Sequence, residues 1–463
     1  MTDPQIVWLR RDLRMADNPA LYHAAKAGPV VAVYVLDDDA PQSHVYGGAS
    51  RWWLHHSLES LSKSFGARNS QIVLRRGDAL EELMAVAHAV GAETIHANRH
   101  YEPWWRKAQG DIAAEIDLQL HDGNYLFPAG HVTTGSGDPY KIYTPFSKAI
   151  LQEMPPRDEL PEPETLSSPG QWPASDALGD WNLLPTAPDW AGGLRDFWTV
   201  GEKAAHERLD WWAEEVAKYD EGRNFPSVDE TSRLSPHLHW GEISPVQIWH
   251  RLKDKRSDGW KTYEKELIWR DYAQNVICQF PAYAKESYRD GWDTEMGWRN
   301  PNRGHIIEEE LERWQKGQTG YPIVDAGMRQ LWKTGWMHNR VRMIAASFLV
   351  KHLLIDWKQG EKWFWDCLVD ADYASNGTNW QWVSGTGVDS NMFSRIMAPL
   401  SQSEKFDAAG YIRAYVPELA DLPDDAIHDP EEHGCRPDSY PSKIISHKEG
   451  RERALEAYRA FKD

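Results

Sequence analysis

The sequence predicts an α/β domain and an all-α domain joined by a long linker. Short apolar runs alternate with helical patterns over the first 130 residues, a proline-rich segment follows, and long Trp-rich helical patterns begin near residue 199. Alternation of strands and helices is typical of a parallel sheet covered on both faces. We therefore expect a doubly wound, Rossmann-like domain over 1–130, an interdomain linker over 131–198 and an α-helical domain over 199–463.

The first domain is predicted from apolar runs separated by amphipathic patterns. The expected strands are 5–9, 30–36, 71–74 and 93–97, and the expected helices include 50–65 and 79–90. No Gly-x-Gly-x-x-Gly follows the first strand, so the dinucleotide-binding fingerprint is absent. Arg10, Arg11 and Arg14 follow that strand instead, and a solvated charged turn is a better interpretation of them than an anion site.

The proline-rich segment runs from Pro155 to Pro188, among Ser, Asp and Glu and without periodicity. Such a composition is typical of an extended linker. Upstream, Gly135-Ser136-Gly137 lacks the Lys-Ser/Thr of a phosphate-binding loop, which favours an ordinary turn.

Composition limits the classes of function. The formal charge of -19 disfavours a nucleic-acid partner unless the surface carries a local basic patch. The three cysteines lie far apart, which indicates neither a disulfide framework nor a zinc ribbon, and we predict no metal site. The N-terminus lacks a basic region followed by an apolar one, and no apolar run is long enough to span a membrane. We expect a cytoplasmic protein without a membrane partner.

The stretch from Asp370 to Trp382 gathers carboxylates, carboxamides and indoles. The apolar run before it indicates that Asp370 points inward, and a buried carboxylate needs a partner. Helical spacing in 335–354 leaves Arg342 on a face away from the apolar stripe. Arg342 is therefore the predicted counter-ion of Asp370.

Two further groups suit ligand binding. The run from Thr231 to Ser235 offers hydroxyls and a guanidinium suited to a pyrophosphate, although a helix cap explains it equally well. Glu266, Trp269 and Arg270 fall at i, i+3 and i+4, so they share one helical face. An ordinary helix with one ion pair and a core Trp is an equally good interpretation.

Three blocks, 319–329, 335–343 and 370–382, resemble the signature blocks of the DNA photolyase and cryptochrome family. The similarity extends from Trp8–Arg14 to Ser439–Pro441. The resemblance implies a deoxyribodipyrimidine photo-lyase that repairs cyclobutane pyrimidine dimers in UV-damaged DNA. In such enzymes, light excites reduced FAD, which passes an electron to the flipped-out dimer; two carbon–carbon bonds break and the electron returns. A monomer is expected. The pattern Ser50–His56, with Tyr143–Phe146 and Asp189-Trp190, is most like bacterial class III enzymes, with class I next.

The resemblance also implies the cofactors and their residues. FAD-binding positions are Tyr219, Thr231, Ser232, Arg233, Leu234, Ser235, Arg342, Asp370, Asp372 and Asn376. Asn376 would lie at flavin N5 and, with Glu266, would act in catalysis. Trp105 stands where folate-binding class I enzymes carry a glutamate, so methenyltetrahydrofolate at a Trp-lined site is the first expectation for an antenna. A deazaflavin or no antenna remains open.

Positions that the resemblance assigns to DNA and the lesion are Arg223, Glu266, Trp269, Arg270, Asn339, Arg340, Met343, Trp382 and Gln402. The six-four photolyases carry a histidine pair where this chain has Asn339 and Met343, which favours cyclobutane dimers. Trp380, Trp357 and Trp298 match an electron relay, with Trp292 and Trp332 as alternatives for its outer end. The alternative function is a cryptochrome-like blue-light photosensor, which would need no lesion pocket.

Overall fold

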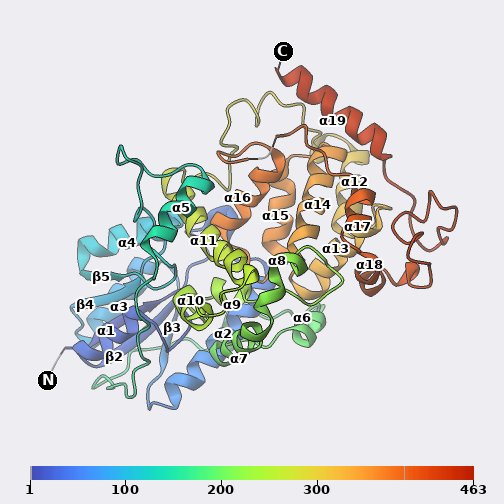
Figure 1. The fold of residues 1–463 in the computed structure, drawn as a ribbon. Helices are drawn as coiled ribbons and strands as arrows, with labels where there is room; N and C mark the ends of the chain where they lie inside the picture. Colours follow the sequence, from blue (N-terminus) through green and yellow to red (C-terminus); the bar gives the residue numbers. More distant parts are fainter. Residues whose placement is uncertain (1–2, 391, 463) are drawn as a thin grey trace.

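The chain folds into an α/β part and a helical part that lie side by side (Figure 1). The computed structural model describes residues 3–390 and 392–462. In Figure 1 the blue and cyan segments form the α/β part, and the green-to-red segments form the helical part. This arrangement confirms the predicted fold class.

A five-stranded parallel sheet in the order β3-β2-β1-β4-β5 forms the centre of the α/β part. Its strands are β1 (Gln5–Leu9), β2 (Val30–Leu36), β3 (Ile72–Arg76), β4 (Thr94–Asn98) and β5 (Asp117–His121). Gln5 of the central strand lies opposite Val30 on one side and Thr94 on the other. The four predicted strands are present. The edge strand β5 was missed, because its half-exposed, polar sequence lacks the apolar run that marked the others.

Helices cover both faces of the sheet because alternate residues of each buried strand point to opposite sides. In β2, Ala32 and Tyr34 join one apolar cluster, whereas Val31 and Val33 join the other. The first cluster packs against α1 (Pro19–Ala27) and α2 (Gly48–Gly66); the second packs against α3 (Ala79–Val90) and α4 (Pro103–Glu115). From β1 the chain adds β2 and β3 towards one edge of the sheet, and it then adds β4 and β5 on the other side of β1. The direction of winding therefore changes between β1 and β4, at the centre of the sheet.

The segment between β5 and α7 (Glu202–Glu215) connects the two parts and holds α5 (Tyr143–Glu153), the short turn η2 (Leu178–Trp181) and α6 (Gly192–Phe197). Between α5 and η2 the chain is extended and bound to the α/β part: Ser167 O accepts from Val30 N at 2.9 Å, and Ser175 Oγ accepts from Leu74 N at 2.9 Å. Helix α5 packs against α11 (Asp258–Gln279) of the helical part.

The helical part surrounds one large apolar cluster. Its other elements are α7 (Glu202–Glu215), η3 (Val216–Lys218), α8 (Tyr219–Gly222), α9 (Ser235–His239), α10 (Pro245–Leu252), η4 (Pro301–Arg303), α12 (His305–Gln315), α13 (Pro322–Thr334), α14 (Asn339–Ser347), the π-helical turn η5 (Phe348–His352), α15 (Trp357–Cys367), α16 (Tyr373–Ser384), α17 (Pro399–Lys405), α18 (Ala409–Tyr415), η6 (Pro417–Leu419) and α19 (His447–Lys462). Helix α16 packs against α11, α14 and α15, so it lies at the centre of this bundle.

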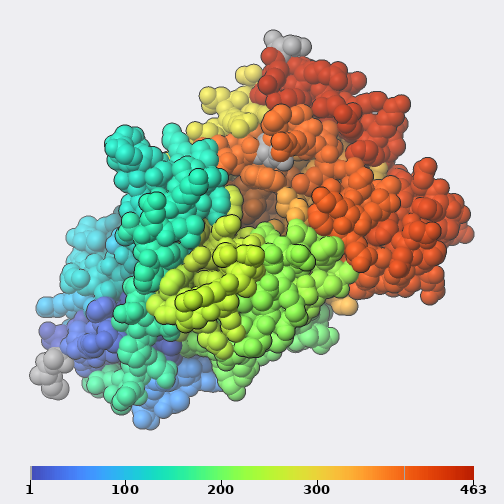
Figure 2. Space-filling model, in the orientation of Figure 1, coloured from blue at the N-terminus to red at the C-terminus, as the bar shows by residue number. Residues whose placement is uncertain are grey.

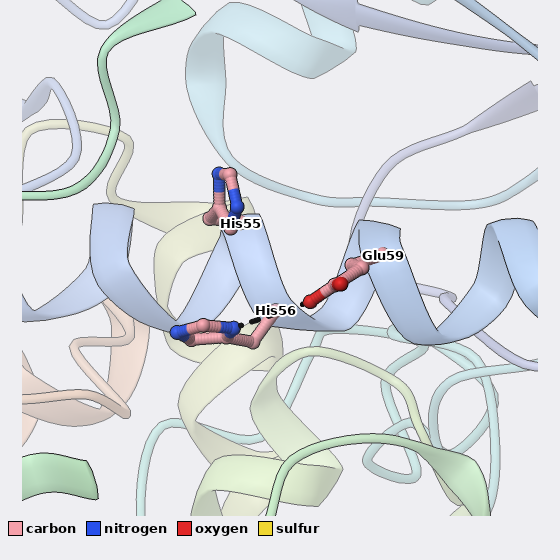
Figure 3. Close-up of side chains that lie close together, drawn as sticks. All are labelled: His55, His56 and Glu59. Atoms are coloured by element: carbon pink, nitrogen blue, oxygen red, sulfur yellow. Dashed lines mark ion pairs between the residues drawn. The ribbon is translucent and has the colours of Figure 1, made fainter. Parts of the chain in front are cut away.

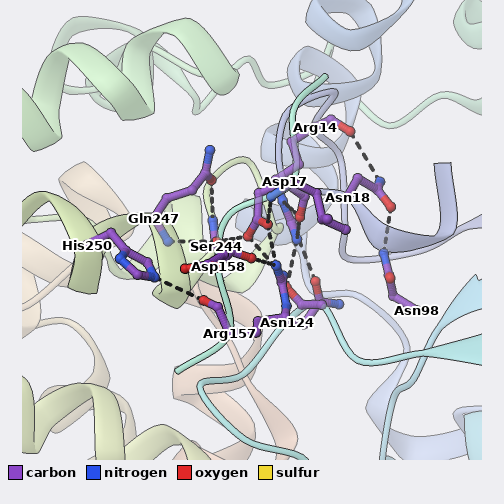
Figure 4. A network of polar contacts seen from close by, with 12 residues as sticks. Arg14, Asp17, Asn18, Asn98, Asn124, Arg157, Asp158, Ser244, Gln247 and His250 are labelled. Atoms are coloured by element: carbon purple, nitrogen blue, oxygen red, sulfur yellow. Dashed lines mark hydrogen bonds and ion pairs between the residues drawn. The ribbon is translucent and has the colours of Figure 1, made fainter. Parts of the chain in front are cut away.

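A buried polar network joins the α/β part, the connecting segment and the helical part (Figure 4). Asp17 is fully buried and pairs with Arg157 Nη1 at 2.5 Å and Nη2 at 2.9 Å. The same carboxylate accepts from Ser244 Oγ, at the start of α10, at 2.5 Å. One side chain thus fixes three segments to one another.

Two simple features complete the fold. Cys278, Cys367 and Cys435 are free thiols. Across residues 3–390 and 392–462, every helix is too short or too polar to cross a bilayer.

Candidate functional site

The start of α16 carries the two aspartates singled out in the sequence. Asp372 is the N-cap of this helix, and its Oδ1 accepts from Ser375 N at 2.7 Å. The side chain of Asp370 is 6% exposed, and its Oδ1 lies 3.5 Å from Nη2 of Arg342 on α14. The ion pair predicted from helical spacing is therefore present.

The arginines after β1 are not a solvated turn, and that interpretation was wrong. Arg10, Arg11 and Arg14 are all buried. Arg11 crosses to the helical part, where its Nη1 lies 2.9 Å from Asp372 Oδ2, and it also pairs with the fully buried Glu102. The carboxylates that stabilise the Arg11 charge lie on distant segments of the chain, so the local sequence carries no sign of them.

This cross-domain pair determines the charge on Asp372. Burial opposes its ionisation, but Arg11, followed by His239, favours the carboxylate and lowers the pKa of Asp372 to about 2. Burial, together with Arg11, also holds the pKa of His239 well below its usual range. At neutral pH the site therefore holds a carboxylate beside a neutral imidazole.

Contacts with Glu361 fix the orientation of the side-chain amide of Asn376 on α16. Its Nδ2 lies 3.0 Å from Glu361 Oε1 and 3.4 Å from Glu361 O, and both of these atoms are acceptors. His44 Nε2 lies 3.3 Å from the same Glu361 Oε1. Because the amino group of Asn376 donates to Glu361, the side-chain carbonyl oxygen of Asn376 can accept from another donor. Glu361 and His44 were both missed by the sequence interpretation.

The run from Thr231 to Ser235 leads into α9, which begins at Ser235, and no side chain caps that helix. Arg208 binds the backbone carbonyls of Ser232 and Thr231 at 2.6 and 2.9 Å. Arg233 adopts a positive φ of 51° and pairs with Asp229 Oδ1 at 2.9 Å. The helix-cap interpretation is therefore not supported, and the loop presents Arg233 by means of a left-handed backbone turn.

Several buried polar atoms around α16 have no hydrogen-bond partner among the described residues. They include Arg233 Nε, His239 Nε2, Arg270 Nη1, Gln274 Oε1 and Thr378 Oγ1. An unsatisfied buried polar atom costs about 1–3 kcal/mol. These donors and acceptors come from the loop before α9 and from α9, α11 and α16, so they fit a polar group held among these helices. The diphosphate and ribityl hydroxyls of the flavin dinucleotide implied by the resemblance have the required chemistry.

The outer part of α11 carries Glu266 and Trp269. Glu266 Oε1 lies 2.5 Å from Arg223 Nη1, so two residues assigned separately to DNA form a pair with each other. The ring of Trp269 lies flat on Tyr143 of α5. In Figure 2 the surface is recessed where the teal segment with α5, the yellow-green segment with α11 and the orange helices meet. Arg270 differs from its two neighbours, because its Nη2 donates to Leu238 O at 3.2 Å.

Four arginines gather around one histidine on the helical part. Burial, together with Arg340, Arg342, Arg223 and Arg233, lowers the pKa of His338 to about 4. Arg340 also pairs with Asn224 and lies 4.5 Å from the centre of the Phe406 ring. Three of the four arginines pair with carboxylates: Arg223 with Glu266, Arg233 with Asp229 and Arg342 with Asp370. Much of the positive charge of this cluster is therefore compensated. The other residues assigned to DNA are partly or fully exposed: Asn339, Met343, Trp382 and Gln402.

The predicted relay tryptophans lie on three segments: Trp380 on α16, Trp357 at the start of α15 and Trp298 shortly before η4. Trp380 is buried, and the centre of its ring lies 6.4 Å from that of Trp314, which the sequence interpretation missed. Trp357 is fully buried and donates to Ser287 Oγ at 3.0 Å. Trp298 Nε1 donates to Trp292 O at 2.7 Å, which links the predicted outer indole to one of its two alternatives.

A hollow lies at the carboxyl ends of β1 and β2, the edge where doubly wound folds bind ligands. Its lining includes Trp8, Arg10, His44, Trp104 and Trp105. The guanidinium of Arg10 lies 3.9 Å from the ring centre of Trp8. The hollow therefore offers aromatic faces and one cation.

One cluster of possible metal ligands, His55, His56 and Glu59, lies on α2 (Figure 3). Their ligand atoms lie within 4.8 Å of one another. However, the Glu59 carboxylate already pairs with Lys63 Nζ at 3.3 Å and with His56 Nδ1 at 3.5 Å, and all three ligands come from one helix. These contacts are those of an ordinary charged helix face.

Comparison with known proteins gives one consistent result. The family described as DNA photolyase matches residues 5–164, and the FAD binding domain of DNA photolyase matches residues 263–460. A deoxyribodipyrimidine photo-lyase of Agrobacterium fabrum is 43% identical, over 100% of this chain and 98% of that protein. That of Escherichia coli is 35% identical over 98% of both. The crystal structure of a bacterial class III photolyase from Agrobacterium tumefaciens superposes with a TM-score of 0.93 at 43% identity, over 100% of this chain and 98% of that one.

Proposed function

Because this chain belongs to the DNA photolyase family, we propose that it is a deoxyribodipyrimidine photo-lyase that repairs cyclobutane pyrimidine dimers in UV-damaged DNA. One observation carries the proposal beyond family membership. Helix α11 bears unsatisfied buried polar atoms on Arg270 and Gln274, and Glu266 and Trp269 lie within one turn of Arg270 on the same face of the helix. A cofactor bound at Arg270 and a lesion bound at Glu266 and Trp269 would therefore lie next to each other along one helix.

The cofactor of this reaction is FAD. When bound and reduced, FAD supplies the photoexcited electron that splits the dimer. Arg233 and Arg270 offer guanidinium groups to the diphosphate, and Asp370 and Asp372 offer acceptors to hydroxyl groups. The carbonyl oxygen of Asn376 would accept a hydrogen bond from the reduced ring, since its amino group is held by Glu361.

The lesion would leave the base stack and enter the recess. Flipping a damaged base costs less than flipping an intact one, so part of the selectivity comes from the DNA itself. Trp269 would stack on the dimer, and Glu266 would act through its charge and hydrogen bonds. Arg223 and Arg340, with Gln402, would contact the phosphates, and each such contact would release counterions from the DNA.

The antenna in our proposal is methenyltetrahydrofolate, bound in the hollow beside Trp104 and Trp105. Trp8, Trp104 and Trp105 offer faces for stacking the pterin, and Arg10 offers a cation for the glutamate carboxylates. A deazaflavin would lack these carboxylates, so loss of binding in Arg10→Met would favour folate. For photoreduction we propose the relay Trp380, Trp357 and Trp298.

Illumination of the FAD-loaded, reduced protein with an oligonucleotide that contains one thymine dimer tests the function. Repair restores thymine absorbance in blue light and not in darkness. A cryptochrome-like photosensor would change its flavin spectrum and leave the dimer intact, which would refute the proposal. Because the substrate is DNA, we place the reaction in the bacterial cytoplasm, and we expect a monomer by gel filtration.

A further inference from the structure

Trp269 is stacked face to face on a residue from outside the helical part. The ring centres of Tyr143 and Trp269 lie 3.4 Å apart and their planes differ by 4°. Tyr143 is the first residue of α5, in the connecting segment. One face of the Trp269 indole is therefore covered, while the side chain as a whole remains partly exposed.

Tyr143 is held in place from three sides. Its hydroxyl donates to Lys265 O at 3.0 Å, and its backbone N donates to Asp389 Oδ2 at 2.8 Å. The buried ring of Tyr272 meets both Tyr143 and Trp269 edge-on, at 5.6 and 5.4 Å. The Tyr143 ring cannot leave the indole without breaking these contacts, so the stack is a rigid unit.

We propose that Tyr143 is a positioning residue for lesion recognition: it backs one face of Trp269 and so holds the opposite face ready for the extruded pyrimidine dimer. This inference rests on the function proposed above. A free indole would lose rotamer freedom when the lesion binds, whereas a backed indole has lost it already. Stacking of a base on an aromatic side chain is worth about 1–3 kcal/mol, and it requires the ring to be oriented.

The inference predicts an effect on specificity. Intact DNA in a duplex does not place its bases against Trp269, so its affinity depends on phosphate contacts that Tyr143 does not make. Removal of Tyr143 therefore weakens binding of damaged DNA alone. Ordering one rotamer-rich side chain on binding costs about 0.5–1.5 kcal/mol, which corresponds to a change in Kd of roughly two- to tenfold.

The experiment compares Tyr143→Ala, Tyr143→Leu and Tyr143→Phe in the full, FAD-loaded chain. Dissociation constants for dimer-containing and undamaged duplexes are measured in the dark by fluorescence anisotropy. We expect Tyr143→Ala and Tyr143→Leu to raise the Kd for damaged DNA about fivefold and to leave the Kd for undamaged DNA unchanged. Phe keeps the stack and loses only the bond to Lys265, so it stays within about twofold of the wild type. Leu fills the space of the ring, so it still tests the stack if Ala does not fold.

Tyr22→Ala on α1 is the matched control, because Tyr22 also pairs edge-on with a neighbouring ring, His23, but lies in the α/β part. It should change neither dissociation constant. The inference would be overturned if Tyr143→Ala and Tyr143→Leu bound damaged DNA as tightly as the wild type or more tightly. Tighter binding would mean that Tyr143 occupies the position of the lesion. A wild-type protein without preference for damaged DNA would instead refute the proposed function.

Discussion

Replacement of Arg11 by Met should destabilise the protein by an amount that can be worked out from the Arg11–Asp372 pair. This change keeps the aliphatic volume and removes the charge that faces Asp372 at 2.9 Å. The pKa of Asp372 falls from 3.8 to about 2 in the folded chain, which corresponds to about 2 kcal/mol of stabilisation at neutral pH. Glu102 also loses its partner, and breaking buried pairs costs about 3–5 kcal/mol. Both values describe the loss of one guanidinium and are not additive, so we expect a total loss of about 3–5 kcal/mol.

The assay is a double-mutant cycle with Arg11→Met, Asp372→Asn and the double variant. The free energy of unfolding is measured in urea at pH 7 by Trp fluorescence. We expect the loss of stability in the double variant to be smaller than the sum of the losses in the two single variants, with a coupling of about 2 kcal/mol. Arg195→Met is the control, because Arg195 forms a similar pair with Asp189 on the exposed surface, and we expect no measurable loss.

The same pair predicts a pH dependence with a definite sign. A carboxylate whose pKa is lowered by folding stabilises the protein above the pKa of the unfolded chain, and this contribution is lost as the pH falls from 3.8 towards about 2. The difference in free energy of unfolding between the wild type and Arg11→Met should therefore have its full value at pH 6 and should become smaller as the pH falls below about 4. A coupling below about 0.5 kcal/mol, or a difference that widens in acid, would refute the reasoning.

Three other variants test separate parts of the molecule. Asp17→Ala removes a buried acceptor shared by Arg157 and Ser244, so the free energy of unfolding in urea should fall by about 3 kcal/mol. Asp189→Ala, at an exposed ion pair, is the control and should leave the free energy of unfolding unchanged. Glu361→Leu frees the amide of Asn376, so the reduced flavin should reoxidise several-fold faster in air, followed by its absorbance; an unchanged rate would mean that Glu361 does not orient the amide. Arg340→Ala should weaken the binding of damaged and undamaged DNA equally, and it should reduce the slope of log K for binding against log salt concentration by about 0.9. A slope equal to that of the wild type would show that Arg340 makes no phosphate contact.

Features with a local periodic signal could be predicted from the sequence. Strand β2 is an unbroken apolar run because both of its faces are buried, and α3 begins at the N-cap Asp78 and ends at the left-handed Gly91. The pair between Arg342 and Asp370 was predictable for a related reason. Helical spacing excluded Arg342 from the apolar stripe, and the buried aspartate then required a cation.

Features that depend on distant partners could not be predicted. Arg11 and Asp372 are 361 positions apart, so a run of arginines after a strand resembled a solvated turn. The stack of Tyr143 on Trp269 was missed because the motif around Tyr143 was interpreted only as a mark of subclass. Glu361 was hidden for the opposite reason, since a glutamate within a charged helical pattern resembles an exposed one.

His44 gives the N-terminal part a direct influence on the flavin side of the protein. It lines the hollow beside Trp104, and its ring contacts Trp365 and Tyr373 while its Nε2 faces Glu361, the partner of Asn376. A chimera that takes its N-terminal part from another relative would therefore also exchange a support of the Asn376 amide. Replacement of the N-terminal part requires His44 to be retained together with the helices that its ring contacts.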